Sequence, residues 1–244
     1  MTNYKMIISY DGGRYEGWAR KVTNDSTIQA VMERAIGKIV GYRVRVDGAS
    51  KTDEGVHARG QVASVLLMKE YDPKELMDHL NRALPDDIRV LEVEMERESF
   101  NAWSSAKGKK YEYYIDCREK PDVFSRRYCF HYPRKLDIEA MREAAELIIG
   151  PRDFTSFTDD ANCEDPVTRI TNIKIVSTGE KVRITYYGTR FLNNMIGIMT
   201  GTLLEVGTGE RQISSIPVII NAQDRGAAGF LAPARGIFLR KVYY

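Results

Sequence analysis

Strand-like and helix-like segments alternate along all 244 residues of this chain, without a low-complexity tract, a long linker or a short tandem repeat. Ser26-Thr27-Ile28-Gln29 is a capping box that opens a helical pattern, and Asp72-Pro73-Lys74-Glu75 combines an N-cap, a first-turn proline and a capping glutamate. This alternation predicts a mixed α+β fold. The segments expected in the first part of the chain are strands at 5–10, 44–46, 62–68 and 88–95, and helices from about 28 to 39 and 72 to 83.

The charge of the chain changes sign around Ser105 to Lys110, where a second half begins, and the order of strands and helices then recurs loosely. This recurrence predicts two ferredoxin-like α+β halves, residues 1–105 and 106–244, that share one sheet. The segments expected in the second half are strands at 109–116, 170–177, 181–188 and 237–243, a helix at 137–149 stopped by Gly150-Pro151, a long helix through Phe191 to Leu203, and a short one at 215–221.

Composition excludes several classes of function. The chain is 43% hydrophobic and 29% charged, and it contains no run of eighteen apolar residues that would predict a membrane span. Its start lacks the pattern of a secretory signal, so we expect a cytoplasmic protein. The three cysteines and three histidines lack metal-site spacing, so we expect reduced thiols and no metal. A net charge of +2 alone does not indicate nucleic-acid binding.

The polar stretch from Gly48 to Val62 stands between two strand signals and carries the most chemistry. Asp53-Glu54-Gly55 fits an ordinary turn, with the glycine at positive φ, and that structural reading has to be weighed first. The residues near Asp53 favour a chemical role instead, because Lys51 precedes this carboxylate while His57 and Arg59 follow it in the same predicted loop. Cations around a single carboxylate suit a polyanionic substrate.

This stretch resembles the signature of the tRNA pseudouridine synthase A (TruA) family. The resemblance rests on Lys51-Thr52-Asp53-Glu54-Gly55-Val56-His57-Ala58 with Gly60-Gln61-Val62, and it continues over nearly the whole chain. The other matching stretches are Tyr10-Asp11-Gly12, Tyr15-x-Gly17-Trp18, Thr27-Ile28-Gln29, Phe100-x-Ala102, Ser105-Ala106, Lys110-Tyr111-x-Tyr113, Asp153 to Phe157, Phe191-Leu192 through Gly201-Thr202-Leu203, and Ala232-Pro233-x-x-Gly236.

The resemblance implies a fold and an activity. The fold is the pseudouridine synthase fold, in which two ferredoxin-like halves share a mainly antiparallel central sheet, with helices on one side and the active-site cleft on the other. The activity is cofactor-free isomerisation of uridine to pseudouridine in the tRNA anticodon arm, at uridines 38–40 in the family, by a homodimer. Neither a cofactor nor a metal is implied.

The resemblance also assigns site residues. Asp53 matches the catalytic aspartate, and Tyr111 matches the tyrosine that stacks on the target base. Taken without the resemblance, Tyr111, Tyr113 and Ile115 share one face of a predicted strand and favour packing instead. The further residues predicted to contact RNA are Lys51, Thr52, His57, Arg59, Gln61, Trp103, Lys110 and Arg190.

Four positions depart from the family pattern. Ala19 stands in place of a glutamine, and Lys51 and Trp103 each stand in place of an arginine. Gly197 replaces an arginine that pairs with the catalytic aspartate, and we hypothesise that Arg190 or Lys51 supplies that charge. These departures leave two alternatives open beside an active tRNA enzyme, namely a synthase with a shifted RNA target and a catalytically silent RNA-binding homologue.

Overall fold

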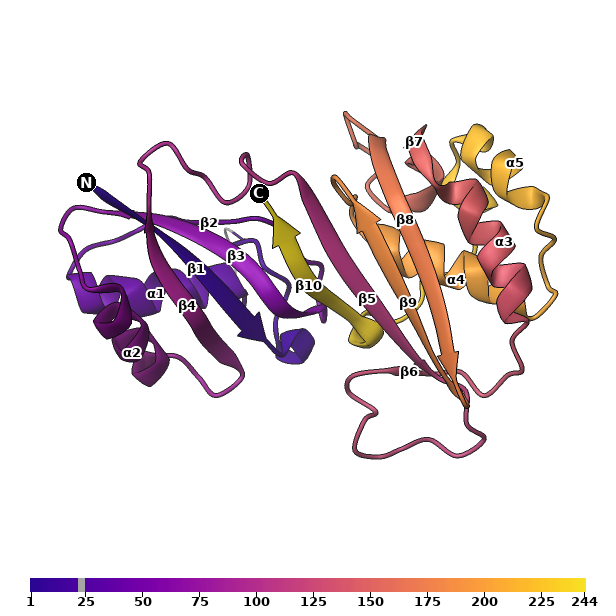
Figure 1. Cartoon of the computed structure of the whole chain (residues 1–244), viewed down its shortest axis with the longest axis horizontal. Coiled ribbons are helices and arrows are strands. Elements are labelled where there is room, and N and C mark those ends of the chain that lie inside the picture. Colours follow the sequence, from indigo (N-terminus) through magenta and orange to yellow (C-terminus); the bar gives the residue numbers. More distant parts are fainter. Residues whose placement is uncertain (22–24) are drawn as a thin grey trace. The chain divides into compact units, whose positions relative to one another are not determined.

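The computed structural model describes residues 1–21 and 25–244, which cluster into two compact units. The first unit contains Met1–Lys107 together with Leu239–Tyr244, and the second contains Gly108–Phe238. The sequence placed residues 239–244 in the second half, whereas these residues cluster with the first. Figure 1 shows the elements of both units in the colours of the sequence. No helix of the described residues has both the length and the apolar character needed to cross a membrane.

The first unit is an antiparallel sheet with two helices. Strand β1 (Thr2–Tyr10) lies between β4 (Ile88–Glu96) and β3 (His57–Leu67), and the short β2 (Val46–Gly48) pairs with residues 63–65 of β3 on the edge opposite β1. Strand β10 (Ile237–Tyr243), most of which belongs to this unit, follows β3 in the strand order. Alternate residues of β1 are completely buried, among them Tyr4, Met6 and Ile8, because one face of the sheet packs on the core.

Both helices of the first unit begin where the capping signals predict. Helix α1 (Ile28–Val40) follows Thr27, whose hydroxyl accepts from the Ala30 amide, and it ends at Gly41 in the left-handed conformation. Helix α2 (Pro73–Ala83) follows Asp72, whose carboxylate accepts from the amides of Lys74 and Glu75. These local bonds satisfy amides that have no partner inside the helix, so both starts are fixed by sequence alone.

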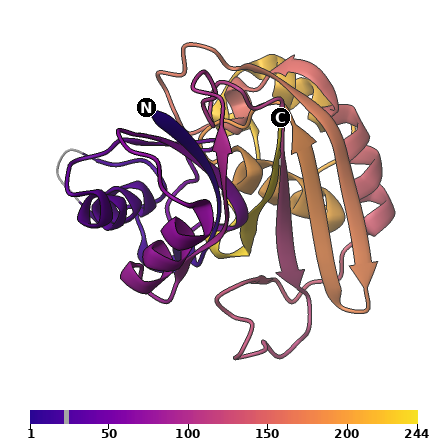
Figure 2. The ribbon, with the colours of Figure 1, turned by 60° about the vertical axis from the view of Figure 1, so that its left-hand side comes forward.

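The second unit repeats the plan of an antiparallel sheet with helices. Its strands follow the order β5 (Gly108–Asp116), β9 (Lys181–Gly188), β8 (Val167–Thr178) and β7 (Gly150–Asp153), with β6 (Phe130–His131) parallel to β5. Helices α3 (Ile138–Ile148) and α4 (Met195–Gly207) contact each other on one side of these strands (Figure 2), and α5 (Ser215–Ala222) contacts α3. The expected α+β class with mainly antiparallel strands is confirmed.

Several segments differ from their predicted bounds. Strand β2 begins two residues later than expected, at Val46, and β3 begins at His57 rather than at residue 62. Residues expected in a loop therefore continue the sheet, as the pairing of Ala58 with Tyr10 and of Gln61 with Ile8 shows. Helix α4 begins only at Met195, because Asn194 adopts a left-handed conformation with φ 56°, which is incompatible with a helix that already includes Phe191.

Two glycines let helix α4 approach the segment around Phe230 at backbone distance. A methyl group at Gly201 would lie 1.8 Å from the Phe230 carbonyl oxygen, and one at Gly197 would lie 2.9 Å from the Ala232 carbonyl oxygen. The Ala232 amide donates to the Gly197 carbonyl at 3.1 Å, which ties the two segments together. The glycines in this apolar helix are thus required by packing, despite their low helix propensity.

We expect Gly201→Ala to lower the free energy of unfolding by about 1–3 kcal/mol, because backbone must move to admit the methyl group. Gly37→Ala in α1 is the matched control, since its methyl would lie 3.2 Å from the Tyr42 carbonyl and needs only a small shift. Its effect should stay within about 1 kcal/mol of zero. Urea denaturation of both variants checks this, and equal stabilities would contradict the close approach.

Candidate active site

The segment that carries Asp53 connects β2 to β3 and is anchored by buried polar side chains. Gln61, which is completely buried, donates from Nε2 to the Ser50 carbonyl at 2.7 Å and accepts from the Ser50 amide at 3.2 Å through Oε1. The hydroxyl of buried Tyr10 lies 2.7 Å from Thr52 Oγ1. Gln61 and Thr52, both predicted to contact RNA, therefore hold the backbone on either side of Lys51.

Asp53 itself begins a tight turn. The Val56 amide donates to the Asp53 carbonyl at 3.2 Å, and Gly55 has φ 75°, which together define a type II turn with glycine at its third position. The turn considered from sequence is therefore present. It also leaves Asp53 half-buried rather than enclosed, so the turn and a chemical role for the carboxylate are compatible.

A second segment, residues 11–18, packs directly on this turn. Trp18 donates its amide to the Thr52 carbonyl at 2.9 Å, and a methyl group at Gly12 would lie 1.9 Å from the Val56 carbonyl oxygen. Buried His57 places Nδ1 3.1 Å from the Gly12 amide and 3.0 Å from Asp11 Oδ1. His57, predicted as an RNA contact, therefore joins the two segments, whereas Arg59 is exposed on β3.

In the second unit, the residues matched to the family lie on β5. Tyr111 is 5% exposed, pairs with Tyr186 of β9, and meets the Phe191 ring edge to face at a centroid distance of 5.1 Å. The neighbouring Lys110 forms an ion pair with buried Glu112 at 2.9 Å. The aromatic packing expected from the strand pattern is thus observed at Tyr111, and the positive charge of Lys110 is partly neutralised.

Sequence reasoning missed Lys109. This lysine is 6% exposed, and burial together with the positive charge of Arg190 lowers its pKa from 10.5 to about 8. Arg190, proposed above as a partner for Asp53, pairs with Asp165 at 2.9 Å and donates to the Val167 carbonyl at 3.1 Å. The only sequence signal was the basic cluster at 107–110.

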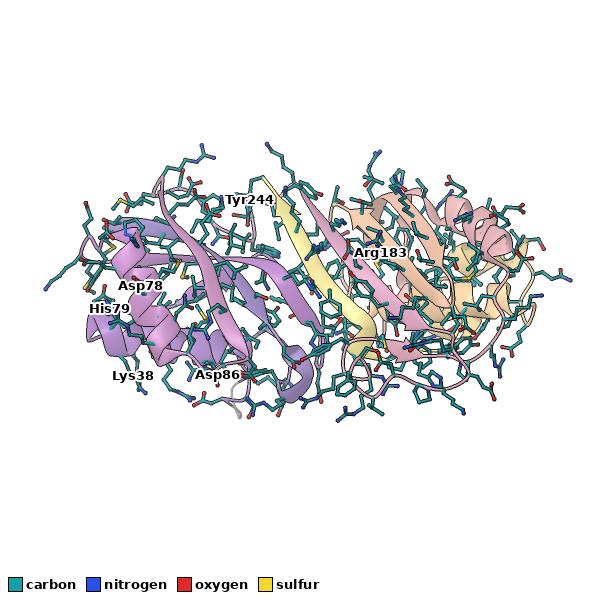
Figure 3. The ribbon with its side chains drawn as sticks, turned by 60° about the horizontal axis from the view of Figure 1, so that its bottom comes forward. Lys38, Asp78, His79, Asp86, Arg183 and Tyr244 are labelled. Carbon is teal, nitrogen blue, oxygen red and sulfur yellow. The ribbon has the colours of Figure 1, made fainter. Side chains whose placement is uncertain are left out.

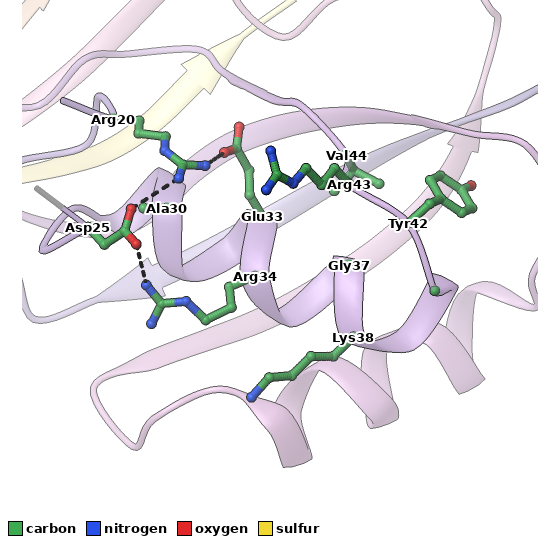
Figure 4. A pocket seen from close by; sticks show the side chains of 11 residues that line it. Arg20, Asp25, Ala30, Glu33, Arg34, Gly37, Lys38, Tyr42, Arg43 and Val44 are labelled. Carbon is green, nitrogen blue, oxygen red and sulfur yellow. Dashed lines mark hydrogen bonds and ion pairs between the residues drawn. The ribbon is translucent and has the colours of Figure 1, made fainter. Parts of the chain in front are cut away.

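Three of the four departures from the family pattern share one pocket in the first unit. A hollow of about 400 Å³ is lined by Ala19, Lys51 and Trp103, together with Trp18, Arg20 and Arg45 among others. The fourth departure, Gly197, lies in α4 against Leu231 and Ala232, where a side chain would meet Leu231 Cδ1 at 2.6 Å. A second hollow of about 510 Å³ beside α1 shares Arg20 (Figure 4).

The described part of the chain holds no group of three or more histidine, cysteine or acidic side chains placed to bind a metal ion. His79 projects from α2 next to Asp78 (Figure 3), and all three cysteines are unpaired thiols.

A family described as tRNA pseudouridine synthase matches residues 6–102 and 144–244 of this sequence. The chain belongs to this family. It is 40% identical over its full length to tRNA pseudouridine synthase A of Bacillus sp. (strain KSM-64) and of Acetivibrio thermocellus, each also covered completely. It is 36% identical over its full length to the protein named tRNA pseudouridine synthase A 2 of Bacillus cereus (strain ZK / E33L). The resemblance found in the motifs is thus confirmed.

We expect Gln61→Leu to impair both stability and catalysis by this synthase. The leucine fills similar space but removes both hydrogen bonds to the Ser50 backbone, at a cost of about 1–3 kcal/mol in the free energy of unfolding. Asn81→Leu is the matched control, because Asn81 bonds the amide and carbonyl of Val90 at 2.9 and 2.8 Å in the same way. Both variants should lose stability in urea, and only Gln61→Leu should lower kcat on tRNA in the folded protein. Equal kcat values would contradict the positioning role.

Lys109 predicts a pH dependence of stability. Between pH 8 and 10.5 this lysine is neutral in the folded chain and charged in the unfolded chain, so stability from this group rises with pH across that window. Buried Tyr10 and Tyr186 act in the opposite direction above about pH 10, because burial raises the pKa of each hydroxyl. We expect Lys109→Met to remove the rise between pH 8 and 9.5 in urea denaturation. Parallel profiles of the variant and the original chain would show that Lys109 is not responsible.

Proposed function

We propose that this chain isomerises uridine to pseudouridine in tRNA, with Asp53 as the catalytic carboxylate and no cofactor. The observation that carries the proposal is the rigidly held Asp53 turn in a chain that belongs to the tRNA pseudouridine synthase family. A carboxylate fixed in this way, and half open to solvent, can meet a ribose or a base without reorganisation.

The reaction needs few groups. The bond between N1 and ribose C1′ breaks, the base turns, a bond forms between C5 and C1′, and the C5 proton is lost while N1 gains one. The carboxylate of Asp53 acts as nucleophile at the sugar or the base, or as base at C2′. Tyr111 stacks on the uracil with its ring, and a weak base removes the C5 proton. Because atoms and electrons balance within one nucleotide, no electron carrier or group carrier takes part.

The substrate we propose is the anticodon arm of tRNA, at uridines 38–40, with two copies of the chain acting as a homodimer in the cytoplasm. The relatives named tRNA pseudouridine synthase A support tRNA as the substrate class. The charge of the chain favours a homodimer, because a net charge of +2 per chain is small and two chains would combine their basic patches on one RNA. Sedimentation of the purified chain tests the dimer.

The deciding experiment is tritium release from a tRNA transcript labelled at uridine C5, with the original chain and Asp53→Asn. We expect release from the original chain and a loss of at least about a thousandfold in the variant, because the amide cannot act as nucleophile or base. RNA affinity should be unchanged and the variant should remain folded, since the Val56 amide still bonds to the Asp53 carbonyl at the turn.

Three other outcomes would contradict the proposal. Binding of tRNA without any release from the original chain would favour the silent RNA-binding homologue that the glycine at position 197 raises as an alternative. Release from other RNAs but not from tRNA would favour a shifted target. Equal loss of stability and activity in Asp53→Asn would reduce Asp53 to a residue of the turn.

A further inference from the structure

The 400 Å³ pocket of the first unit lies beside the Asp53 turn, since Lys51 and Gly48 line it and the turn follows them directly. Its wall includes buried Trp18, whose ring is in contact with Gly48; a methyl group there would lie 2.2 Å from Trp18 Cε2. Ala19 contributes a single methyl group, so a longer side chain at that position would take up part of the volume. The volume lies within the range of about 300–1,000 Å³ typical of small-ligand pockets.

Trp103 presents an exposed ring on an ordered segment. Asn101 Oδ1 accepts from the amides of Trp103 at 3.0 Å and Ser104 at 3.1 Å, and Asn101 Nδ2 donates to Asp47 at 3.0 Å. The backbone of this tryptophan is therefore held by neighbours, whereas its side chain is 58% exposed at the rim of the pocket. A large apolar ring that is open to solvent on an anchored backbone is a surface for stacking.

Basic side chains line the same pocket as this ring. Lys51 is exposed and has no hydrogen bond or ion pair among the described residues, 1–21 and 25–244. Arg45 pairs with Asp47 at 3.0 Å, but its side chain is 85% exposed and this carboxylate is also bonded to Asn101. Asp47 is the only acidic residue in the pocket lining, beside three basic ones. The pocket therefore favours an anionic ligand with a flat ring.

We propose that this pocket binds one single-stranded nucleotide of the RNA, next to the reacting uridine, with its base stacked on Trp103 and its phosphate beside Lys51 and Arg45. That the ligand is RNA rests on the proposed function. Stacking on an indole tolerates every base, so the site adds affinity and registers the strand without reading sequence. Lysine supplies the charge at position 51, and the tryptophan supplies the flat surface that lysine lacks.

The larger hollow beside α1 is less suited to this role. Its Arg20 and Arg34 both pair with Asp25, and Arg20 also pairs with Glu33 (Figure 4). Its only aromatic ring, Tyr42, has its hydroxyl bonded to the Met68 amide at 2.7 Å. The combination of an exposed flat ring with an unpaired cation is therefore found in the pocket at Trp103.

The test is the affinity of the full chain for a fluorescein-labelled, unstructured RNA of five nucleotides, measured by anisotropy. Trp103→Ala should raise Kd by about 5- to 100-fold, and Trp103→Phe should restore most of the affinity because phenylalanine still stacks. Lys51→Ala should weaken binding less and reduce the salt dependence by about one charge. Ala19→Gln should also weaken binding, because its side chain occupies the pocket.

Two control variants make matching changes at positions outside the pocket. Phe124→Ala removes an aromatic ring that is 89% exposed, and Lys69→Ala removes an exposed cation, so each should change Kd by less than about twofold. With tRNA as substrate, Trp103→Ala should raise KM and leave kcat unchanged, as expected for a contact made equally in the ground and transition states.

Unchanged oligonucleotide affinity in Trp103→Ala, with the fold intact by circular dichroism, would overturn the proposal. Unchanged affinity together with a smaller sedimenting species would instead assign Trp103 to contact between two copies of the chain, and would overturn it as well. Failure of the proposed function is distinguishable, because the original chain would then release no tritium from tRNA while the Trp103 variants still differed in RNA affinity.

Discussion

The paired hydrogen bonds between the Gln61 side chain and the backbone of Ser50 are the constraint on which the Asp53 turn depends. Gln61 belongs to β3, and its pairing with β1 fixes its position. Its side-chain amide therefore holds Ser50, which lies in the irregular segment between β2 and β3. Because Gln61 is completely buried, water cannot replace either bond. The carboxylate is thus positioned by the sheet, although it lies on a turn.

Close backbone contacts complete this arrangement. Gly12 and Gly17 allow the segment after β1 to touch the carbonyls of Val56 and Thr52, and Gly17 also adopts positive φ. Any side chain at these positions would separate the two segments by the width of a methyl group or more. Glycines therefore allow the close backbone contacts that support the turn, and polar side chains make the hydrogen bonds that hold it.

The sequence predicted the features of the fold that depend on residues close together in the chain. Capping residues such as Thr27 and Asp72 gave the starts of α1 and α2, and the alternation of apolar residues gave most strands. The start of α4 and the extension of β3 to His57 could not be predicted, because Asn194 takes a left-handed conformation and His57 to Gln61 pair with a distant strand. Likewise, the lowered pKa of Lys109 results first from burial in the fold and then from the positive charge of Arg190, which is 81 positions away in the sequence. Motif comparison identified the family, but it did not predict the hydrogen bonds that Thr52, His57 and Gln61 make within the protein, and their contact with RNA stays a prediction.

The four departures from the family pattern lie in two different places in the fold. Ala19, Lys51 and Trp103 come from three separate stretches of sequence and line one pocket, so their changes in size, charge and shape act on the same space. Gly197 is different, because it faces Leu231 and Ala232 at distances that leave no room for a side chain without backbone movement. An arginine reintroduced at that position alone would have to displace the segment that carries Ala232, which donates to the Gly197 carbonyl. The packing of α4 therefore leaves no room for a side chain at position 197, whereas the side chains of Lys51 and Trp103 are exposed and are not fixed by core packing.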